Sequence, residues 1–311
     1  MKSIITGGAG FIGSHIQDRL VDLGHEVLII DSLRSGKEKN LNPKSKFLKI
    51  DLRDRDTLIK AVKDFNPDNI FHLAAQNEVP YSMDHPDEDL QINIIGMVNL
   101  LDAAKNLEKM PKIIYSNTGG AYYGEVDYNL MPLNEDIPVA KPTSFYGVSK
   151  AAAEQYLKLY GTIYNIPWVS LRYANVYGPR QDGNREAGIV AIFTSKMLSG
   201  EAPTIFGDGS HVRDYVFVED VCNANIAALN YDKNDYFNIA TGKEITNNQV
   251  FETLEKILQT GLKVNHAADR PGDVLKNSLS PDKAKILLKW EPKNSFEEGL
   301  KKTIAYYKSI N

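Results

Sequence analysis

The chain has 311 residues, of which 42% are hydrophobic and 24% charged, and its formal net charge is −4. This length and composition are typical of a globular protein with one large α/β domain or two unequal ones. The acidic balance and the lack of a basic arm argue against a nucleic-acid partner, and no apolar run approaches the ~20 residues of a membrane span.

The cysteine and histidine content bears on the compartment of the protein and on metal binding. Cys222 is the single cysteine and cannot form a disulfide within the chain, which is typical of a reducing compartment. The N-terminus runs directly into a strand and a glycine-rich loop, so we expect no cleavable signal peptide and a cytoplasmic protein. The six histidines have no metal-ligand spacing, and we expect no metal site.

Short β-rich runs alternate with longer helical patterns along the first 180 residues. Strands are predicted over 3–6, 26–30, 46–50, 69–74, 112–116 and 168–173, and helices over 11–23, 54–65, 87–107 and 145–164. Strands separated by helices imply a parallel sheet with helices on both faces. The predicted fold class is therefore α/β, a Rossmann-type doubly wound parallel sheet.

The pattern changes beyond residue 180, where glycine, proline and polar residues become more frequent. The segments 212–221 and 236–241 still predict a strand, a helix and a strand, so we expect 216–242 to return to the first sheet. The last ~70 residues predict a small mixed α/β unit. We therefore expect one domain over 1–178 and a smaller one over 179–311, with a ligand cleft between them.

The stretch TGGAGFIGSH (6–15) follows the first predicted strand and opens the first predicted helix. The GxxGxxG spacing of Gly7, Gly10 and Gly13 allows a tight turn, close approach to a pyrophosphate and close helix–strand packing. The helix N-terminus then presents unpaired N–H groups and a partial positive charge to the phosphates. This context predicts a dinucleotide site, and a purely structural turn is the alternative.

Acidic and small residues follow the next three predicted strands. Asp31 ends the second strand, where a carboxylate accepts ribose hydrogen bonds and repels a 2′-phosphate, which favours NAD over NADP. A turn cap is the alternative for Asp31, and Arg34 is a counter-signal. Asp51 and Leu52 follow the third strand, in position to meet the adenine or to cap the next helix. The small residues in HLAAQ (72–76) let the backbone lie against the cofactor.

The stretch SFYGVSKAAAEQY (144–156) places Tyr146 and Lys150 four residues apart, on one helix face. An ammonium beside a phenol stabilises the phenolate and lowers its pKa. Such a tyrosine can remove a proton from a substrate hydroxyl while hydride leaves the same carbon. An ordinary surface pair is the alternative, but the dinucleotide loop and the hydroxyl-bearing stretch SNTGGAYYG (116–124) favour chemistry.

With these motifs the chain resembles the extended short-chain dehydrogenases/reductases, and most of all the UDP-glucose 4-epimerase group of nucleotide-sugar enzymes. The resemblance spans nearly the whole chain and rests on TGGAGFIGSH, Asp31, DLRD (51–54), HLAAQ, the 116–124 loop, YGVSK, RYANVYGPRQ (172–181), FGDGSHVRDYVFVEDV (206–221), FNIATG (237–242) and RPGDV (270–274). It implies an NAD-binding Rossmann domain followed by a nucleotide-sugar-binding domain.

The resemblance also implies residue roles. Tyr146 is the active-site base, Lys150 orients it and contacts the nicotinamide ribose, and Thr118 assists at the sugar O4. NAD is lined by Gly7, Gly10, Phe11, Ile12, Gly13, Asp31, Asp51, Leu52, Ala74, Asn93, Tyr146, Lys150 and Tyr173. The nucleotide-sugar contacts Thr118, Tyr146, Asn175, Arg213, Arg270 and Asp273. Arginine suits the diphosphate because its fork pairs two oxygens at once, and a surface ion pair is the alternative.

The 116–124 loop indicates the reaction type. In related dehydratases an Asp-Glu pair follows the threonine, whereas Gly119 and Gly120 follow Thr118 here, and glycine cannot transfer a proton. This favours 4-epimerisation of a UDP-hexose through a transient 4-keto sugar. The usual epimerase loop has its hydroxyl at the position of Gly119, so we expect a one-residue bulge to restore the geometry of Thr118. Ser116 is the rival hydroxyl.

Several alternatives concern substrate and assembly. Asn277 stands where a bulky aromatic would close the sugar pocket, so an N-acetylated sugar is a further hypothesis. A UDP-glucuronate 4-epimerase or a non-catalytic NAD(P)-binding sensor remain alternatives, although a sensor needs no Tyr146–Lys150 pair. The resemblance implies a homodimer in which helices 87–107 and 145–164 form a four-helix bundle across a two-fold axis, and burial within the monomer is the alternative.

Overall fold

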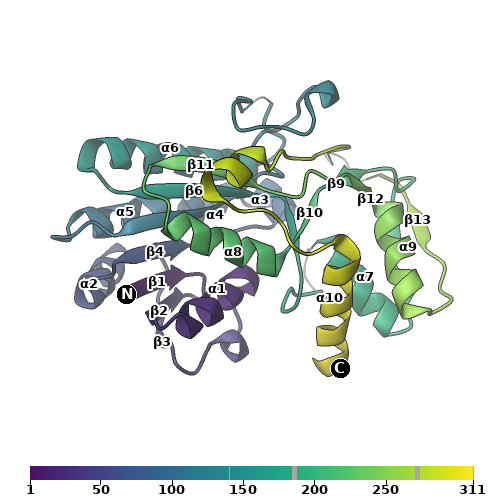
Figure 1. Ribbon diagram of the computed structural model, residues 1–311, viewed down its shortest axis with the longest axis horizontal. Coiled ribbons are helices and arrows are strands. Elements are labelled where there is room, and N and C mark those ends of the chain that lie inside the picture. The colour runs from purple at the N-terminus through teal and green to yellow at the C-terminus, as the bar shows by residue number, and fades with distance from the viewer. Residues whose placement is uncertain (140, 184–187, 270–273, 311) are drawn as a thin grey trace.

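The computed structural model describes residues 1–139, 141–183, 188–269 and 274–310. Its centre is a seven-stranded parallel sheet with the strand order β11-β6-β5-β4-β1-β2-β3 (Figure 1). The strands are β1 (Lys2–Thr6), β2 (Glu26–Asp31), β3 (Lys46–Lys49), β4 (Asn69–His72), β5 (Lys112–Thr118), β6 (Trp168–Tyr173) and β11 (Asp235–Ile239).

This sheet confirms the predicted doubly wound α/β fold. The six strands predicted in the first 180 residues all form, with ends that differ by at most two residues. The late strand β11 pairs with β6, so the chain does return to the first sheet. The division into domains at residue 178 stays a prediction.

Helices cover both faces of the sheet (Figure 1). On one face α1 (Phe11–Asp22) packs against α8 (Val218–Leu229), and on the other α5 (Gly96–Lys105) packs between α2 (Arg55–Phe65) and α6 (Phe145–Tyr164). Neighbouring residues of β1 alternate between the two cores, with Ile5 facing α1 and Ile4 facing α2 and α5. Burial on both sides explains the near-continuous apolar strands.

The helix predicted over 87–107 forms with one irregular turn. It consists of α4 (Pro86–Leu90), a π-helical turn η2 (Gln91–Ile95) and α5, and the short helix α3 (Val79–Asp84) precedes it. Within the π turn, the Asn93 amide donates to the Gln76 carbonyl at 3.0 Å and accepts from the Gln76 N–H at 2.9 Å. Such turns often mark functional sites, and this one ties the helix to the segment after β4.

Most of the elements after β6 build a mixed α/β unit beside the sheet, at the right of Figure 1. A third core, with Phe193, Leu254 and Leu300, holds its main helices together. The two-residue and three-residue strands pair as β10-β7, β12-β9 and β13-β8. The elements are β7 (Asn175–Tyr177), α7 (Ile189–Leu198), β8 (Thr204–Phe206), β9 (Val212–Arg213), β10 (Tyr215–Phe217), β12 (Ile245–Thr246), α9 (Asn247–Leu258), β13 (Asn265–Ala267) and α10 (Phe296–Ile310). The turn η4 (Ala284–Leu288) instead packs against β11 and α8.

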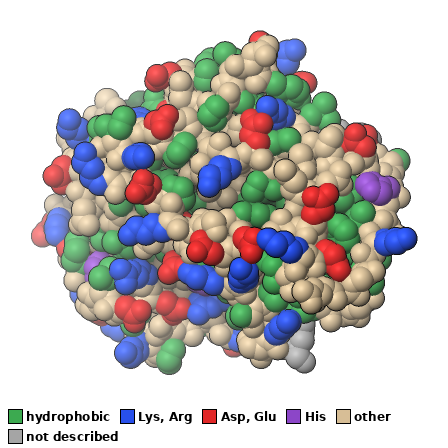
Figure 2. Space-filling model, turned by 45° about the vertical axis from the view of Figure 1, so that its right-hand side comes forward, with side chains coloured by type: hydrophobic (Ala, Val, Ile, Leu, Met, Phe, Trp, Pro, Cys, Tyr) green, Lys and Arg blue, Asp and Glu red, His purple; other side chains and the backbone are tan. Residues whose placement is uncertain are grey.

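The surface carries mixed charge on the face seen in Figure 2, where Lys and Arg side chains are interspersed with Asp and Glu. That face shows no basic stripe of the kind that follows a nucleic-acid backbone. Among the described residues, no helix is long and apolar enough to cross a membrane.

The sheet order reverses between β1 and β4. The chain proceeds from β1 to β2 and β3 in one direction, and from β4 to β5 and β6 in the other. In open α/β sheets, ligands bind at the carboxyl ends of the strands where this reversal occurs. Gly7 lies there with a φ of +72°, and a Cβ on it would come within 2.6 Å of the Ala74 nitrogen. Only glycine allows these two segments to meet so closely.

Candidate active site

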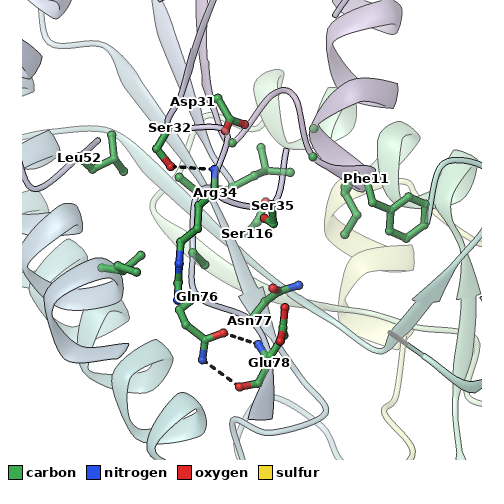
Figure 3. Close-up of a pocket in the computed structure, with 18 of the residues that line it drawn as sticks. Phe11, Asp31, Ser32, Arg34, Ser35, Leu52, Gln76, Asn77, Glu78 and Ser116 are labelled. Carbon is green, nitrogen blue, oxygen red and sulfur yellow. Dashed lines mark hydrogen bonds between the residues drawn. The ribbon is translucent and has the colours of Figure 1, made fainter. Parts of the chain in front are cut away.

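A cavity of about 460 Å³ opens at this switch point (Figure 3). Its wall comes from the segments that follow β1, β2, β3 and β4, together with β5, β6 and the first turns of α6. Every residue predicted to line the cofactor lines this cavity except Asn93, namely Gly7, Gly10, Phe11, Ile12, Gly13, Asp31, Asp51, Leu52, Ala74, Tyr146, Lys150 and Tyr173. Asn93 lies one layer behind, bonded to Gln76.

The N-terminus of α1 forms one end of the cavity. Gly10 is its N-cap residue, the first turn holds no acid, and no described side chain caps it. A Cβ on Gly13 would lie 2.3 Å from the Gly7 carbonyl oxygen, so the loop and helix are packed at backbone distance. Free N–H groups and the helix dipole attract phosphate. The cradle therefore fits the pyrophosphate of a dinucleotide.

Asp31 shapes the second wall. Its carboxylate accepts hydrogen bonds from the backbone N–H of Ala9 at 3.0 Å and of Leu33 at 2.8 Å. Burial raises the pKa of this carboxyl, and the two hydrogen bonds oppose that rise. The turn-cap interpretation is thus confirmed, and it is compatible with ribose binding because a carboxylate can accept about four hydrogen bonds.

Arg34, whose positive charge would favour NADP, has an acidic and an aromatic partner in the structure. Its guanidinium lies 3.2 Å from the Glu88 carboxylate and 4.9 Å from the centre of the Tyr81 ring. In Figure 3 the side chain runs along the cavity, from the loop after Asp31 toward Gln76. Glu88 therefore balances the charge that would otherwise favour a 2′-phosphate.

Asp51 also lines the cavity, and it does not cap α2. The N-cap residue is Asp54, whose side chain accepts from the Thr57 N–H at 3.3 Å, so the capping alternative for Asp51 is wrong. Asp51 instead pairs with Arg53, with a shortest N–O distance of 2.6 Å. Hydrogen bonding to Arg53 lowers the pKa of the Asp51 carboxyl, so it stays ionised.

Tyr146 and Lys150 lie on the buried face of α6, in the cavity wall. Burial raises the pKa of Tyr146 to about 12, although a hydrogen bond with the Thr118 side chain opposes this. Burial also lowers the pKa of Lys150 to about 7, against the attraction of Asp89 and Glu154. Burial thus dominates the pKa of the phenol in this structure, and its lowering by Lys150 stays a prediction.

The Lys150 ammonium has partners of its own. Its Nζ donates to the Ser116 carbonyl at 2.7 Å and lies 4.3 Å from the centre of the Tyr115 ring. Helix α6 is thereby tied to β5 where the cavity begins. The contact fixes the lysine near the phenol without a direct bond between them.

Thr118 and Ser116 share one face of β5, because side chains alternate along a strand. The Ser116 hydroxyl is bonded to the Tyr173 hydroxyl at 2.9 Å, whereas the Thr118 hydroxyl accepts from the Ala121 N–H at 3.2 Å and lies close enough to Tyr146 to affect its pKa. Pairing with β6 is continuous from Ile113 to Thr118. The strand is thus regular up to Thr118, and the bulge expected at the two following glycines lies beyond it and stays a prediction.

The two glycines after Thr118 have different surroundings. A Cβ on Gly119 would lie 2.2 Å from the Leu279 side chain and 3.2 Å from the Arg172 carbonyl oxygen. A Cβ on Gly120 would meet only Asn175 Oδ1 at 3.6 Å and the Thr118 hydroxyl at 3.8 Å, which are ordinary contacts. An acid in the dehydratase position directly after the threonine would therefore have to displace Leu279 and would crowd the Arg172 and Tyr173 carbonyl oxygens.

The predicted substrate residues lie on the other side of the loop. Asn175, on β7, approaches Gly120, and its backbone N–H donates to the Asp214 carbonyl at 2.9 Å. Arg213 precedes Asp214 on β9 and donates to the Val212 carbonyl at 2.8 Å, outside the cavity wall. Arg270 and Asp273 fall outside the described residues.

Asn277, the proposed pocket-opening residue, is buried against the same loop. Its Nδ2 lies 3.5 Å from the Gly120 carbonyl oxygen, and its Oδ1 has no hydrogen-bond partner in the described part of the chain. A buried amide oxygen without a partner costs free energy unless a ligand or water satisfies it.

Two charged residues behind the loop were not singled out from the sequence. Glu154, on α6, and Arg172, on β6, form a buried ion pair with a shortest N–O distance of 2.6 Å. The sequence could have indicated them, because each is the single charged residue of a largely apolar stretch, AAAEQYL for Glu154 and WVSLRY for Arg172. Charged side chains are seldom fully buried unless they are paired.

In the described ranges, no three His, Cys, Asp or Glu side chains gather as metal ligands.

Comparisons with known proteins give a consistent result. A model of the NAD-dependent epimerase/dehydratase family matches residues 3–240. The chain is 38% identical to a UDP-glucose 4-epimerase of Mycolicibacterium smegmatis, over 99% of both chains. It is similar to the UDP-glucose 4-epimerase of Thermotoga maritima solved with UDP-glucose, with a TM-score of 0.96, 44% identity and coverage of 100% and 99%. It is also similar to the UDP-N-acetylglucosamine 4-epimerase of Methanobrevibacter ruminantium, solved with UDP-N-acetylmuramic acid, with a TM-score of 0.93, 39% identity and the same coverage.

Proposed function

The chain belongs to the NAD-dependent epimerase/dehydratase family, and we propose that it inverts C4 of a UDP-hexose, interconverting UDP-glucose and UDP-galactose. One observation carries this proposal. Thr118 lies close enough to Tyr146, beside the dinucleotide cradle, to affect its pKa, and a side chain at Gly119 would overlap Leu279 and crowd two backbone carbonyls. The site is thus equipped for proton and hydride transfer at one carbon, and not for removal of water.

The cavity residues would hold NAD along the carboxyl edge of the sheet. The Gly7–Gly13 loop receives the pyrophosphate, Asp31 the adenosine ribose, Asp51 and Leu52 the adenine, and Lys150 the nicotinamide ribose. When bound, NAD supplies a reversible acceptor for one hydride. The sheet and α1 form one domain, residues 1–178 with 216–242, and the residues of 179–311 that lie outside the sheet form the sugar-nucleotide domain.

Tyr146 is the proton acceptor for the sugar O4 hydroxyl, and Thr118 hydrogen-bonds the same oxygen. The O4 proton moves to the Tyr146 oxygen as the C4 hydride leaves, which produces a 4-keto sugar. Tyr146 must be ionised to accept this proton, and a protonated Lys150 favours that form. On the return step Tyr146 gives the proton back to O4.

Inversion requires the keto sugar to present its other face before hydride returns. The diphosphate and nucleoside are held by Asn175, Arg213, Arg270 and Asp273, while the sugar turns in the space beside Gly120. Because Gly119 and Gly120 have no acid or base, water is not eliminated from the keto sugar, and it is reduced at the same carbon.

Conversion of UDP-galactose to UDP-glucose by the purified protein tests this function. We expect turnover without added cofactor if NAD is retained through purification, and turnover on added NAD otherwise. Tyr146→Phe should abolish the conversion while NAD binding persists. Bound NAD with no conversion of any UDP-hexose or UDP-glucuronate would favour the sensor alternative.

A second substrate class is favoured by Asn277. Its Nδ2 lies 3.5 Å from the Gly120 carbonyl oxygen, in the loop that carries Thr118, and its Oδ1 has no partner among the described residues. An N-acetyl group offers an N–H donor to such an oxygen. We therefore expect UDP-N-acetylgalactosamine to be converted with a kcat/KM within about tenfold of that for UDP-galactose. A strong preference for the plain sugar would refute the open pocket.

We further propose that the protein lies in the cytoplasm, where the buried thiol of Cys222 stays reduced. We also propose that it forms a homodimer whose interface includes α6. Val148, Tyr156, Leu159 and Ile163 are exposed apolar residues at helical spacing on α6. Leu90 and Ile95, at the ends of α4 and η2, extend this apolar surface. Such a stripe is typical of a helix that packs against another helix.

A further inference from the structure

We infer that the buried ion pair of Glu154 and Arg172 positions the Thr118 hydroxyl against Tyr146. The inference rests on the proposed epimerisation and assigns two positioning residues to it. Neither side chain lines the cavity. Both act through the loop 116–124, because side chains of that loop form hydrogen bonds to this pair.

The ion pair is fully enclosed. Glu154 is 0% exposed and Arg172 is 2% exposed. Arg172 Nη2 lies 2.6 Å from Glu154 Oε1, and its Nε lies 3.0 Å from Oε2. Hydrogen bonding to Arg172 overcomes burial and lowers the pKa of Glu154 to about 2, so the pair stays charged. Apolar residues of the same volume would often be as stable, so a buried pair of this kind suggests a role beyond stability.

The loop is anchored to this pair on both sides of Thr118. Before it, Asn117 Nδ2 donates to Glu154 Oε2 at 2.9 Å, and Asn117 Oδ1 accepts from the Thr118 N–H at 2.8 Å. After it, the Tyr122 hydroxyl donates to Glu154 Oε1 at 2.9 Å and accepts from Arg172 Nη2 at 2.8 Å. The flexible pair Gly119–Gly120 is thus held between two fixed ends.

Helix α6 connects this anchor to the base. Tyr146, Lys150 and Glu154 follow one another at four-residue intervals and share one helix face. The same rigid helix therefore carries the phenol and fixes the loop that carries the hydroxyl. A displacement of about 1 Å between reacting groups can cost roughly 100-fold in rate, so this coupling has a catalytic consequence.

A matched pair of variants tests the inference. Tyr122→Phe removes one loop anchor and leaves the ring in place. Ser170→Ala is the control, because the Ser170 hydroxyl donates to the same Glu154 carboxylate at 2.8 Å but lies on β6, outside the loop. For Tyr122→Phe we expect kcat to fall roughly 10- to 100-fold while KM and the NAD dissociation constant change less than about threefold. Ser170→Ala should keep kcat within about threefold.

Hydrogen exchange of the NAD-bound protein gives a second readout. The peptide covering 117–124 should exchange faster in Tyr122→Phe than in Ser170→Ala or the wild type. Equal kcat values for the two variants, or unchanged exchange in the loop, would overturn the inference. A wild type that converts no sugar while the loop still loosens in Tyr122→Phe would instead refute the proposed function.

Discussion

Thr118 and Ser116 project from the same face of β5, yet their hydroxyl groups have different partners. The Ser116 hydroxyl is bonded to Tyr173, whereas Thr118 meets Tyr146. We therefore expect Thr118→Val to lower kcat about 100-fold with little change in UDP-sugar affinity, because the hydroxyl acts on the reacting oxygen. Ser116→Ala should lower kcat less than about fivefold. Steady-state kinetics and calorimetric titration with UDP-glucose measure both, and the reverse order would move the assignment to Ser116.

Lys150 is a buried cation, and its burial makes stability depend on pH. The fall in its pKa from 10.5 to about 7 corresponds to at most roughly 5 kcal/mol. Below pH 7 both the folded and unfolded states carry the proton, so the full destabilisation applies. Between pH 7 and 10.5 the unfolded state binds more protons, so the free energy of unfolding rises with pH.

Lys150→Met should remove this pH dependence. We expect the variant to be inactive, yet more stable than the wild type at pH 6 by a few kcal/mol, with the difference shrinking toward pH 10. Chemical denaturation of cofactor-free protein at pH 6, 8 and 10 measures it. Lys60→Met, at an exposed site on α2, is the control and should keep the slope of the wild type. A difference independent of pH would contradict the assigned cause.

The sequence predicts which residues meet in the cavity better than it predicts their ionisation. The spacing of Tyr146 and Lys150 places them on one helix face whatever surrounds them. Their pKa values depend on how deeply the helix is buried and on Asp89, which comes from a different element. That information arises only when α4, β5 and α6 pack together.

At the scale of elements, the turn after β5 can be tested by a pair of alanine variants. Gly119→Ala should destabilise the protein by about 1–3 kcal/mol, because its methyl group would overlap the buried Leu279 side chain and lie only 3.2 Å from two backbone carbonyl oxygens. Gly120→Ala should be nearly neutral in stability, since its methyl group meets only ordinary contacts. Thermal denaturation compares them directly, and equal melting temperatures would contradict the packing of this turn.

The elements themselves follow closely from local pattern, with two informative exceptions. The π turn at η2 was not predicted, because its bonding partner, Gln76, lies in another segment. The strand β5 extends two residues beyond its predicted end, because Thr118 pairs with Tyr173 on β6. In both cases a long-range contact, invisible to periodicity, decides the local geometry.

At the scale of the whole molecule, the order of elements predicts that the chain returns to its first sheet. The apolar strand at 235–239 has no hairpin partner nearby and pairs with β6 in parallel. The short strands β7 to β10 and β12, of two or three residues each, were not separable by pattern, because so few residues define no period. Their pairing depends on the third core, to which distant helices contribute.

Assembly provides the last test at this scale. Leu159 and Ile163 are 53% and 57% exposed in the single chain, and with Val148 and Tyr156 they form a stripe along α6. Burying this stripe against a second copy removes apolar surface from water, whereas a charge placed in its centre stays solvated only in the monomer. Sedimentation velocity should therefore show a dimer for the wild type and a monomer for Leu159→Glu. Ile286→Glu is the control, because Ile286 is 63% exposed on η4, away from this stripe, and the variant should remain dimeric. A monomeric wild type, or dissociation of both variants alike, would contradict an interface on α6.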